Sequence, residues 1–236
     1  MNETKRPRIL VFASGDAKGG GSGFQELVEF SRTEPPVLSA QIAGVISNHE
    51  QGGVWKRAEN LGIPFVFWPG PFKGVQYQKF VDDFEADFVM LSGWLKKVEG
   101  LDPTKTVNIH PGPLPEFGGK GMYGHRVHEA VIAAYKHGEI KQSAFTMHFV
   151  DPEYDHGPII FQFPVLIRPD DTPETLADRV NEKERAWQAF ILNHVVHGDI
   201  WLNCKEDRDD WKVYHSQTGL WPHIGHDDPT SVLLSL

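Results

Sequence analysis

The segment Arg8-Ile9-Leu10-Val11-Phe12-Ala13-Ser14-Gly15 decides the fold class of this chain of 236 residues. Its unbroken apolar run, which ends at a serine and a glycine, is typical of a strand buried on both faces of a parallel sheet. Similar runs lie at residues 40–47, 63–68, 88–91 and 106–110, and three segments with helical periodicity separate the first four strands. Strands that alternate with helices predict an α/β fold with a doubly wound, mainly parallel sheet.

The second half of the chain has a different pattern. A helical segment at residues 123–135 precedes two β-rich segments at 142–150 and 158–167. The run Asp171-Thr172-Pro173-Glu174-Thr175 indicates a helix start, because Asp and Thr are good N-caps and Pro is favoured in the first turn. This helix is expected to reach about His197. We therefore expect one domain with a β-rich C-terminal half over residues 1–214, which ends in a hairpin at 200–214, and an irregular tail at 215–236.

Composition and charge exclude several kinds of protein. The net charge of −9 argues against general nucleic-acid binding, but a helix N-terminus and a few cations can still hold an anionic small substrate. Cys204 is the only cysteine, so no disulfide forms within the chain. Residues Met1 to Arg8 lack the apolar core of a signal peptide, and no apolar run has membrane-spanning length. We expect a cytoplasmic monomer or homodimer without nucleic-acid or membrane partners.

Polar residues stand at the carboxyl ends of the expected strands, where open parallel sheets bind ligands. Asn108 and His110 are two residues apart in the fifth strand, so their side chains face the same side. An uncharged N–H donor beside a titratable ring suits acyl transfer, because one can stabilise an oxyanion while the other moves protons. Ser14, Ser47 and Ser92 end three other strands. These positions predict one cleft at this edge of the sheet.

A glycine-rich loop at residues 15–23 follows the first strand. Backbone N–H groups at a helix N-terminus bind phosphate, and glycine allows a ligand to approach closely. Ser22 adds a hydroxyl, whereas Lys18 fits neither the P-loop nor the dinucleotide-binding spacing. From the residues alone, the loop is either a phosphate site or a surface turn.

Three other positions have two interpretations each. Asp155 is followed by His156 and Gly157, which favours a turn, and the alternative is a carboxylate that orients His110 or a water. Lys96-Lys97 is either a solvated turn or a cationic rim for an acidic ligand. Glu184-Arg185 has the composition of an exposed, salt-bridged helix face.

A metal site is the less favoured interpretation of the histidines. His125 and His128 are three residues apart on one expected helix, a spacing that can hold a metal. The chain offers no second thiol and no His-Glu-x-x-His pattern beside them. We therefore expect no metal.

Four blocks of sequence together resemble the folate-dependent formyltransferases, over roughly residues 8–203. The blocks are Asn108-Ile109-His110-Pro111-Gly112-Pro113-Leu114-Pro115, Gly124-His125-Arg126, Thr146-Met147-His148-Phe149-Val150 and Asp155-His156-Gly157-Pro158-Ile159-Ile160. The resemblance implies a Rossmann-like formyltransferase fold, with a nucleotide-binding half at residues 8–115 and a folate-binding half at 116–214. It also implies transfer of a formyl group from 10-formyltetrahydrofolate to the amine of glycinamide ribonucleotide, a phosphorylated substrate of purine biosynthesis.

The resemblance also implies roles for individual residues. Asn108 would donate to the oxyanion, His110 would hold or relay the proton, and Asp155 would keep His110 basic. The ribonucleotide would be bound by Gly21, Ser22, Gly23 and Glu184, and the pterin by Trp94, Leu95, Lys96, Lys97 and Val98. Residues 116–123 would form the folate loop. This chain departs from the family pattern in two places, with Gly23 where Asn is usual and Lys96 where Arg is usual.

Related and unrelated functions compete with this one. A formyltransferase acting on a sugar nucleotide, a methionyl-tRNA formyltransferase and a formyltetrahydrofolate hydrolase share the chemistry. The acidic charge argues against tRNA, and Ser22 in a phosphate-type loop favours the ribonucleotide. A non-catalytic nucleotide- or folate-binding module would not need the set of Asn108, His110 and Asp155, because binding alone requires no proton transfer.

Overall fold

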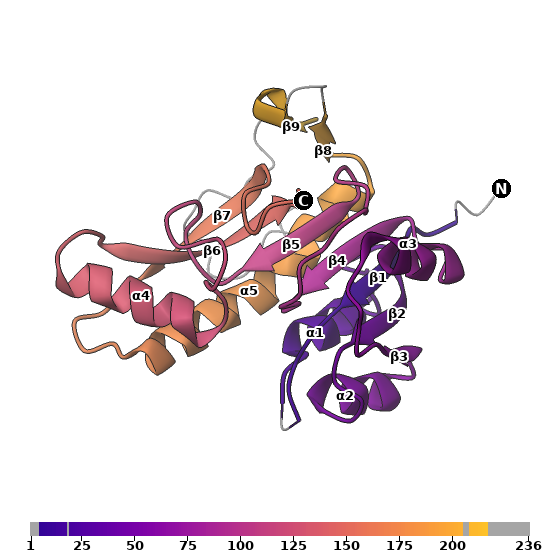
Figure 1. Ribbon diagram of the computed structural model, residues 1–236, viewed down its shortest axis with the longest axis horizontal. Coiled ribbons are helices and arrows are strands. Elements are labelled where there is room, and N and C mark those ends of the chain that lie inside the picture. Colours follow the sequence, from indigo (N-terminus) through magenta and orange to yellow (C-terminus); the bar gives the residue numbers. More distant parts are fainter. Residues whose placement is uncertain (1–4, 18, 205–207, 217–236) are drawn as a thin grey trace.

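The computed structural model describes residues 5–17, 19–204 and 208–216, and a seven-stranded sheet forms its centre (Figure 1). The strand order is β3-β2-β1-β4-β5-β6-β7; the pairs among β1 to β5 are parallel, and β6 is antiparallel to both β5 and β7. The strands are β1 Arg8–Phe12, β2 Gln41–Ser47, β3 Phe65–Phe67, β4 Phe88–Ser92, β5 Thr106–His110, β6 Gln142–Phe149 and β7 Ile159–Leu166. This confirms the predicted mainly parallel, doubly wound sheet.

Helices cover both faces of the sheet. They are α1 Ser22–Phe30, α2 Gly53–Leu61, α3 Gly74–Asp83, α4 His125–Lys136 and α5 Pro173–Val196. Alternate residues of each strand enter two separate cores, as the period of two requires. Ile9 and Val11 join the core that contains residues of α1, α2, α4 and α5, whereas Leu10 and Phe12 join the core that contains Tyr77 of α3. The strand ends can therefore present side chains toward two different layers.

Most element boundaries agree with the sequence predictions within a few residues, and the differences have local causes. The fourth helix begins at His125 because Gly124 before it has φ 54 and ψ −131, outside the helical region. The predicted start of α5 is confirmed: Thr172 is its N-cap, and its side chain and that of Thr175 form a reciprocal capping box. No helix of the described part of the chain is long and apolar enough to cross a membrane.

A two-stranded hairpin follows the sheet, as the sequence predicts. β8 (Ile200–Asn203) pairs antiparallel with β9 (Lys212–His215), and Figure 1 shows the pair apart from the central sheet. The expected irregular tail from His215 needs correction at its first residue, because His215 pairs with Ile200 as the last residue of β9. The rest of that tail, from residue 217, lies outside the described residues.

Candidate active site

A cavity of about 730 Å³ lies at the carboxyl ends of β4 and β5. All the residues that the sequence analysis proposed individually for catalysis or for binding the ribonucleotide and the pterin line it. These residues are Gly21, Ser22, Gly23, Trp94, Leu95, Lys96, Lys97, Val98, Asn108, His110, Asp155 and Glu184. The expected folate loop at 116–123 lines it from Gly119 to Tyr123. Segments that are far apart in the chain therefore meet at this edge of the sheet, as the strand-end pattern predicts.

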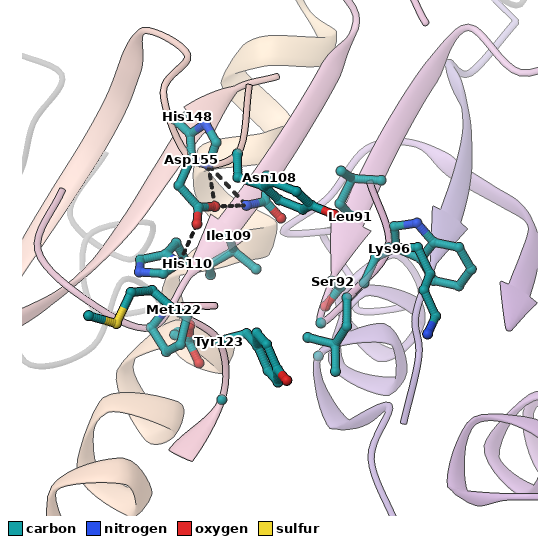
Figure 2. Close-up of a pocket in the computed structure, with 18 of the residues that line it drawn as sticks. Leu91, Ser92, Lys96, Asn108, Ile109, His110, Met122, Tyr123, His148 and Asp155 are labelled. Carbon is teal, nitrogen blue, oxygen red and sulfur yellow. Dashed lines mark hydrogen bonds and ion pairs between the residues drawn. The ribbon is translucent and has the colours of Figure 1, made fainter. Parts of the chain in front are cut away.

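Asn108, His110 and His148 converge on Asp155 in this cavity (Figure 2). Asn108 donates to His148 Nε2 at 2.9 Å and, through a longer contact of 3.4 Å, to Asp155 Oδ1. His148 Nδ1 lies 2.8 Å from the Phe149 carbonyl, which can only accept, so this nitrogen carries the hydrogen. In the neutral ring, Nε2 is then an acceptor, and this fixes the Asn108 amide with its NH₂ group toward His148 and Asp155.

His110 is buried, and both of its ring nitrogens have partners. Nε2 lies 2.8 Å from the Phe117 carbonyl and Nδ1 lies 3.5 Å from Asp155 Oδ2. A carbonyl only accepts, so Nε2 carries a hydrogen, and the carboxylate beside Nδ1 favours a second proton there. Burial lowers the pKa of His110, while Asp155 and the Phe117 carbonyl raise it in part. The opposed effects suit a group that gives up and regains a proton.

Asp155 occupies the turn that the sequence favoured and is also part of the cluster. Its φ of 54 lies in the left-handed region, which a non-glycine residue adopts at some cost. Burial alone would raise the pKa of Asp155, but its interactions with His148, whose Nε2 lies 3.7 Å from Oδ1, and with His110, together with a 3.1 Å bond from Gly119 N–H, lower it. Asp155 is therefore a carboxylate at neutral pH.

The loop that carries Asp155 is held from two sides. The buried Asp151 accepts hydrogen bonds from the Glu153 backbone N–H at 2.8 Å and from His156 Nδ1 at 3.0 Å. Arg208, from the connection between β8 and β9, forms an ion pair with Asp151 and lies 3.3 Å from Glu153. The C-terminal hairpin thus contacts the loop at residues 151–157.

The glycine-rich loop leads into α1 with the geometry of an anion site. Gly21, the N-cap of α1, has φ 79, and no side chain caps the first turn. The first N–H groups of a helix have no partners within the helix and attract anions. Ser22 is the first residue of this turn and lines the cavity.

Glu184 lies in the cavity rather than on an exposed helix face, which corrects the interpretation from composition. Burial raises the pKa of its carboxyl group to about 8, and the nearby Arg185 opposes this only in part. Arg185 itself lies 3.8 Å from Glu26 of α1. Glu184 can therefore offer an O–H group or a carboxylate to a ligand.

The other side of the cavity is aromatic. Trp94 Nε1 donates to the Tyr77 hydroxyl at 2.9 Å, and this hydroxyl donates to the Lys97 carbonyl at 2.9 Å. The ammonium group of Lys96 lies 5.4 Å from the centre of the Phe72 ring, within cation–π range. The predicted pterin segment therefore combines a rigid apolar wall with a cation at its edge.

His148 is the functional candidate that sequence reasoning missed. Antiparallel β5 and β6 pair Asn108 with His148, and directly opposed residues place their side chains on the same face. The sequence could have pointed to His148 only if the β5–β6 register had been known. His125 and His128 line the cavity too, but the described residues contain no group of three or more His, Cys, Asp or Glu that could hold a metal.

Comparison with known proteins identifies the class. The Formyl transferase family model matches residues 7–192, and the chain belongs to this family. It is 38% identical over 222 residues to the chloroplastic phosphoribosylglycinamide formyltransferase of Vigna unguiculata, covering 88% of this chain and 64% of that protein. It is 30% identical to phosphoribosylglycinamide formyltransferase of Bacillus subtilis, covering 80% of this chain and 94% of that one. The chain thus spans about two thirds of its plant relative.

A solved structure supports the same assignment. Phosphoribosylglycinamide formyltransferase of Coxiella burnetii superposes with a TM-score of 0.72 at 27% identity, over 89% of this chain and 94% of that one. The Rossmann-like formyltransferase fold is therefore confirmed.

Proposed function

We propose that this protein transfers a formyl group from 10-formyltetrahydrofolate to the amine of glycinamide ribonucleotide. The observation that carries the proposal is the convergence of Asn108, His110 and Asp155 in a cavity that has the uncapped N-terminus of α1 on one side and an aromatic wall on the other. The relatives named for this reaction support the choice of substrate.

Catalysis would begin when the ribonucleotide amine attacks the formyl carbon. The C=O bond opens to an oxyanion, the bond from carbon to the folate N10 then breaks, and a proton lost by the amine ends on N10. The long 3.4 Å contact from Asn108 to Asp155 is the weaker of the two amide contacts, so its hydrogen is the one available to the oxyanion. The 2.9 Å contact with His148 keeps the amide in place meanwhile.

His110 and Asp155 would manage the proton. The protonated ring of His110 places a positive charge beside the developing oxyanion, and Asp155 supplies the counter-charge 3.5 Å away. Because burial favours the neutral ring and Asp155 favours the charged one, His110 can hold the proton for a short time and release it.

The substrates would occupy opposite ends of the cavity. Gly21, Ser22 and Gly23 bind the phosphate through N–H and hydroxyl groups, and Glu184 binds the ribose hydroxyls. The pterin packs in the segment Trp94-Leu95-Lys96-Lys97-Val98, where Lys96 supplies a point charge rather than a bidentate fork.

An absorbance assay of 10-formyltetrahydrofolate consumption, with and without glycinamide ribonucleotide, tests the proposal. Consumption that depends on the ribonucleotide, together with formation of the formylated product, supports it. Consumption without the ribonucleotide would indicate a hydrolase. Binding of either compound without turnover would indicate a binding module and contradict the proposal.

A further inference from the structure

A buried amide connects three elements on the ribonucleotide side of the cavity. Gln188 of α5 is 1% exposed, its Nε2 donates to the Gly23 carbonyl at 2.8 Å, and its Oε1 accepts from the Ser92 hydroxyl at 3.2 Å. Ser92 is the last residue of β4, and Gly23 lies in the first turn of α1. All three residues line the cavity.

The direction of each hydrogen bond follows from the carbonyl of Gly23. A backbone carbonyl only accepts, so Gln188 must turn its NH₂ group toward it. The amide oxygen then faces Ser92 and also only accepts, so the Ser92 hydroxyl has to donate its one hydrogen to Gln188. Toward a ligand, Ser92 Oγ can therefore only accept a hydrogen bond, through its lone pairs.

Ser92 and Gln188 pack so closely against Gly23 that no side chain fits at this position. A Cβ atom on Gly23 would lie 2.3 Å from Ser92 Oγ and 2.9 Å from Gln188 Nε2. These separations are far below ordinary contact distances, so the glycine allows the serine and the amide to reach the helix start. The three residues form one tightly packed polar unit rather than three independent contacts.

We infer that Ser92 is a specificity-determining acceptor, which takes a hydrogen bond from an uncharged O–H or N–H group of the ribonucleotide, and that Gln188 is the positioning residue that fixes its direction. The inference rests on the proposed function and adds a contact to it. Lone pairs disfavour an anion, so the phosphate belongs to Ser22 and the α1 N-terminus, where hydrogens face the ligand. The two serines lie close together beside Gly23 and would thus contact different, neighbouring groups of one substrate.

The location supports a role in binding rather than in the chemical step. Ser92 pairs with Ile109 in the parallel β4–β5 ladder, whereas Leu91 pairs with Asn108. Ser92 therefore points to the face opposite to Asn108, toward α1 and α5, where Gln188 contacts it. Figure 2 shows Ser92 away from the cluster around Asp155.

The test measures binding of glycinamide ribonucleotide by calorimetry, together with kcat and both KM values, for Ser92→Ala, Gln188→Leu and the double variant. Ser92→Ala is expected to weaken ribonucleotide binding about three- to tenfold, the usual effect of one neutral hydrogen bond. Gln188→Leu should have a similar effect. The double variant should bind the ribonucleotide no more weakly than whichever single variant has the lower affinity. The kcat and the folate KM should stay within about twofold of wild type. Ser143→Ala, a buried serine outside the cavity, is the control and should bind as wild type does.

The outcomes separate this inference from the proposed function. The inference would be overturned if Ser92→Ala bound the ribonucleotide as tightly as wild type. It would also be overturned if the fold-losses in affinity of the two single variants multiplied in the double variant. Formyl transfer would stand in both cases. A wild type that binds the ribonucleotide without turnover would remove the proposed function, and the affinities would still decide the role of Ser92. A wild type that does not bind it overturns both. Should Gln188→Leu fail to fold, Gln188→Met replaces it.

Discussion

His148 Nε2 lies 2.9 Å from the Asn108 amide nitrogen, directly opposite it in the β5–β6 pair. Because the Phe149 carbonyl takes the hydrogen of His148 Nδ1, the neutral ring meets Asn108 as an acceptor. β6 therefore sets the orientation of the Asn108 amide on β5, and the amide in turn faces the place that we propose for the oxyanion.

Replacing His148 by Ala is expected to lower kcat about ten- to a hundredfold, because a freely rotating Asn108 amide no longer points at the oxyanion. Both KM values should change little, since His148 touches neither proposed binding segment. Steady-state kinetics with both substrates measure the effect. His137→Ala, at the exposed end of α4, is the matched control and should leave kcat unchanged. A normal kcat in His148→Ala would show that Asn108 is held without it.

Asp155→Asn and His110→Ala are each expected to lower turnover by at least about a hundredfold, the usual scale for acid–base and oxyanion groups. The asparagine retains the shape of Asp155 but removes the charge that faces His110. Single-turnover formyl transfer is the appropriate measurement, because it reports the chemical step. Asp83→Asn, an exposed change on α3, serves as control. Turnover near the wild-type value in either variant would reject the role assigned to that residue.

Ser22→Ala is expected to raise the ribonucleotide KM several-fold without changing the folate KM, because one hydrogen bond to the phosphate is lost. Initial rates with each substrate varied in turn provide the measurement. Ser31→Ala is a matched change at the other end of α1, where the hydroxyl donates to the Val28 carbonyl. An unchanged ribonucleotide KM in Ser22→Ala would exclude this hydroxyl from the phosphate site.

Glu184→Gln is expected to change how stability depends on pH. Burial raises the pKa of Glu184 to about 8 from an ordinary value of 4.5, so between these values the folded state holds a proton that the unfolded state has released. The free energy of unfolding of the wild type therefore falls as pH rises through this window. Glu184→Gln removes this contribution and should gain stability relative to wild type toward about pH 8.

Urea unfolding at several pH values between these limits measures that difference. Glu182→Gln changes an exposed glutamate on the same helix and should leave the pH dependence as in the wild type. Parallel curves for wild type and Glu184→Gln would show that the carboxyl group is solvated normally.

Asp171→Asn is expected to lower the free energy of unfolding by about 3 kcal/mol, because it leaves the Arg179 guanidinium without its buried partner. The two side chains meet at 2.6 and 2.8 Å. Arg179 holds the pKa of Asp171 well below its ordinary value of 3.8, so this contribution is present above about pH 4 and is lost as pH falls. Urea unfolding at pH 7 measures it. Lys79→Ala, which breaks an exposed pair with Asp83, should change stability by less than about 0.5 kcal/mol.

The fold could be predicted because its signals are local. The apolar run at Arg8 and its repeats, the capping residues at Thr172 and the strand-end pair of Asn108 and His110 each report a structure within a few neighbouring residues. Asp155 could be placed near His110 only by resemblance, since a turn residue carries no information about which strand it faces.

Other parts of the site depend on contacts that no local pattern encodes. His148 requires the β5–β6 register, and the Ser92–Gln188 pair joins positions in β4 and α5 that are far apart in the chain. The composition of Glu184-Arg185 suggested an exposed helix face, because composition cannot show that α5 turns this side toward the cavity. Tertiary packing decides all three.

The ion pair between Arg208 and Asp151 connects the loop that carries Asp155 to a residue outside the family match. The family match ends at residue 192, and a protein shortened to that length would retain every side chain that we propose for catalysis. It would nevertheless leave the buried Asp151 without its guanidinium, and the turn that carries Asp155 would lose an anchor. The trimmed version would also lose the buried Val195, Val196, Ile200 and Leu202 from the core. It should therefore be less stable and transfer formyl groups poorly, so a minimal catalyst has to retain the β8–β9 hairpin.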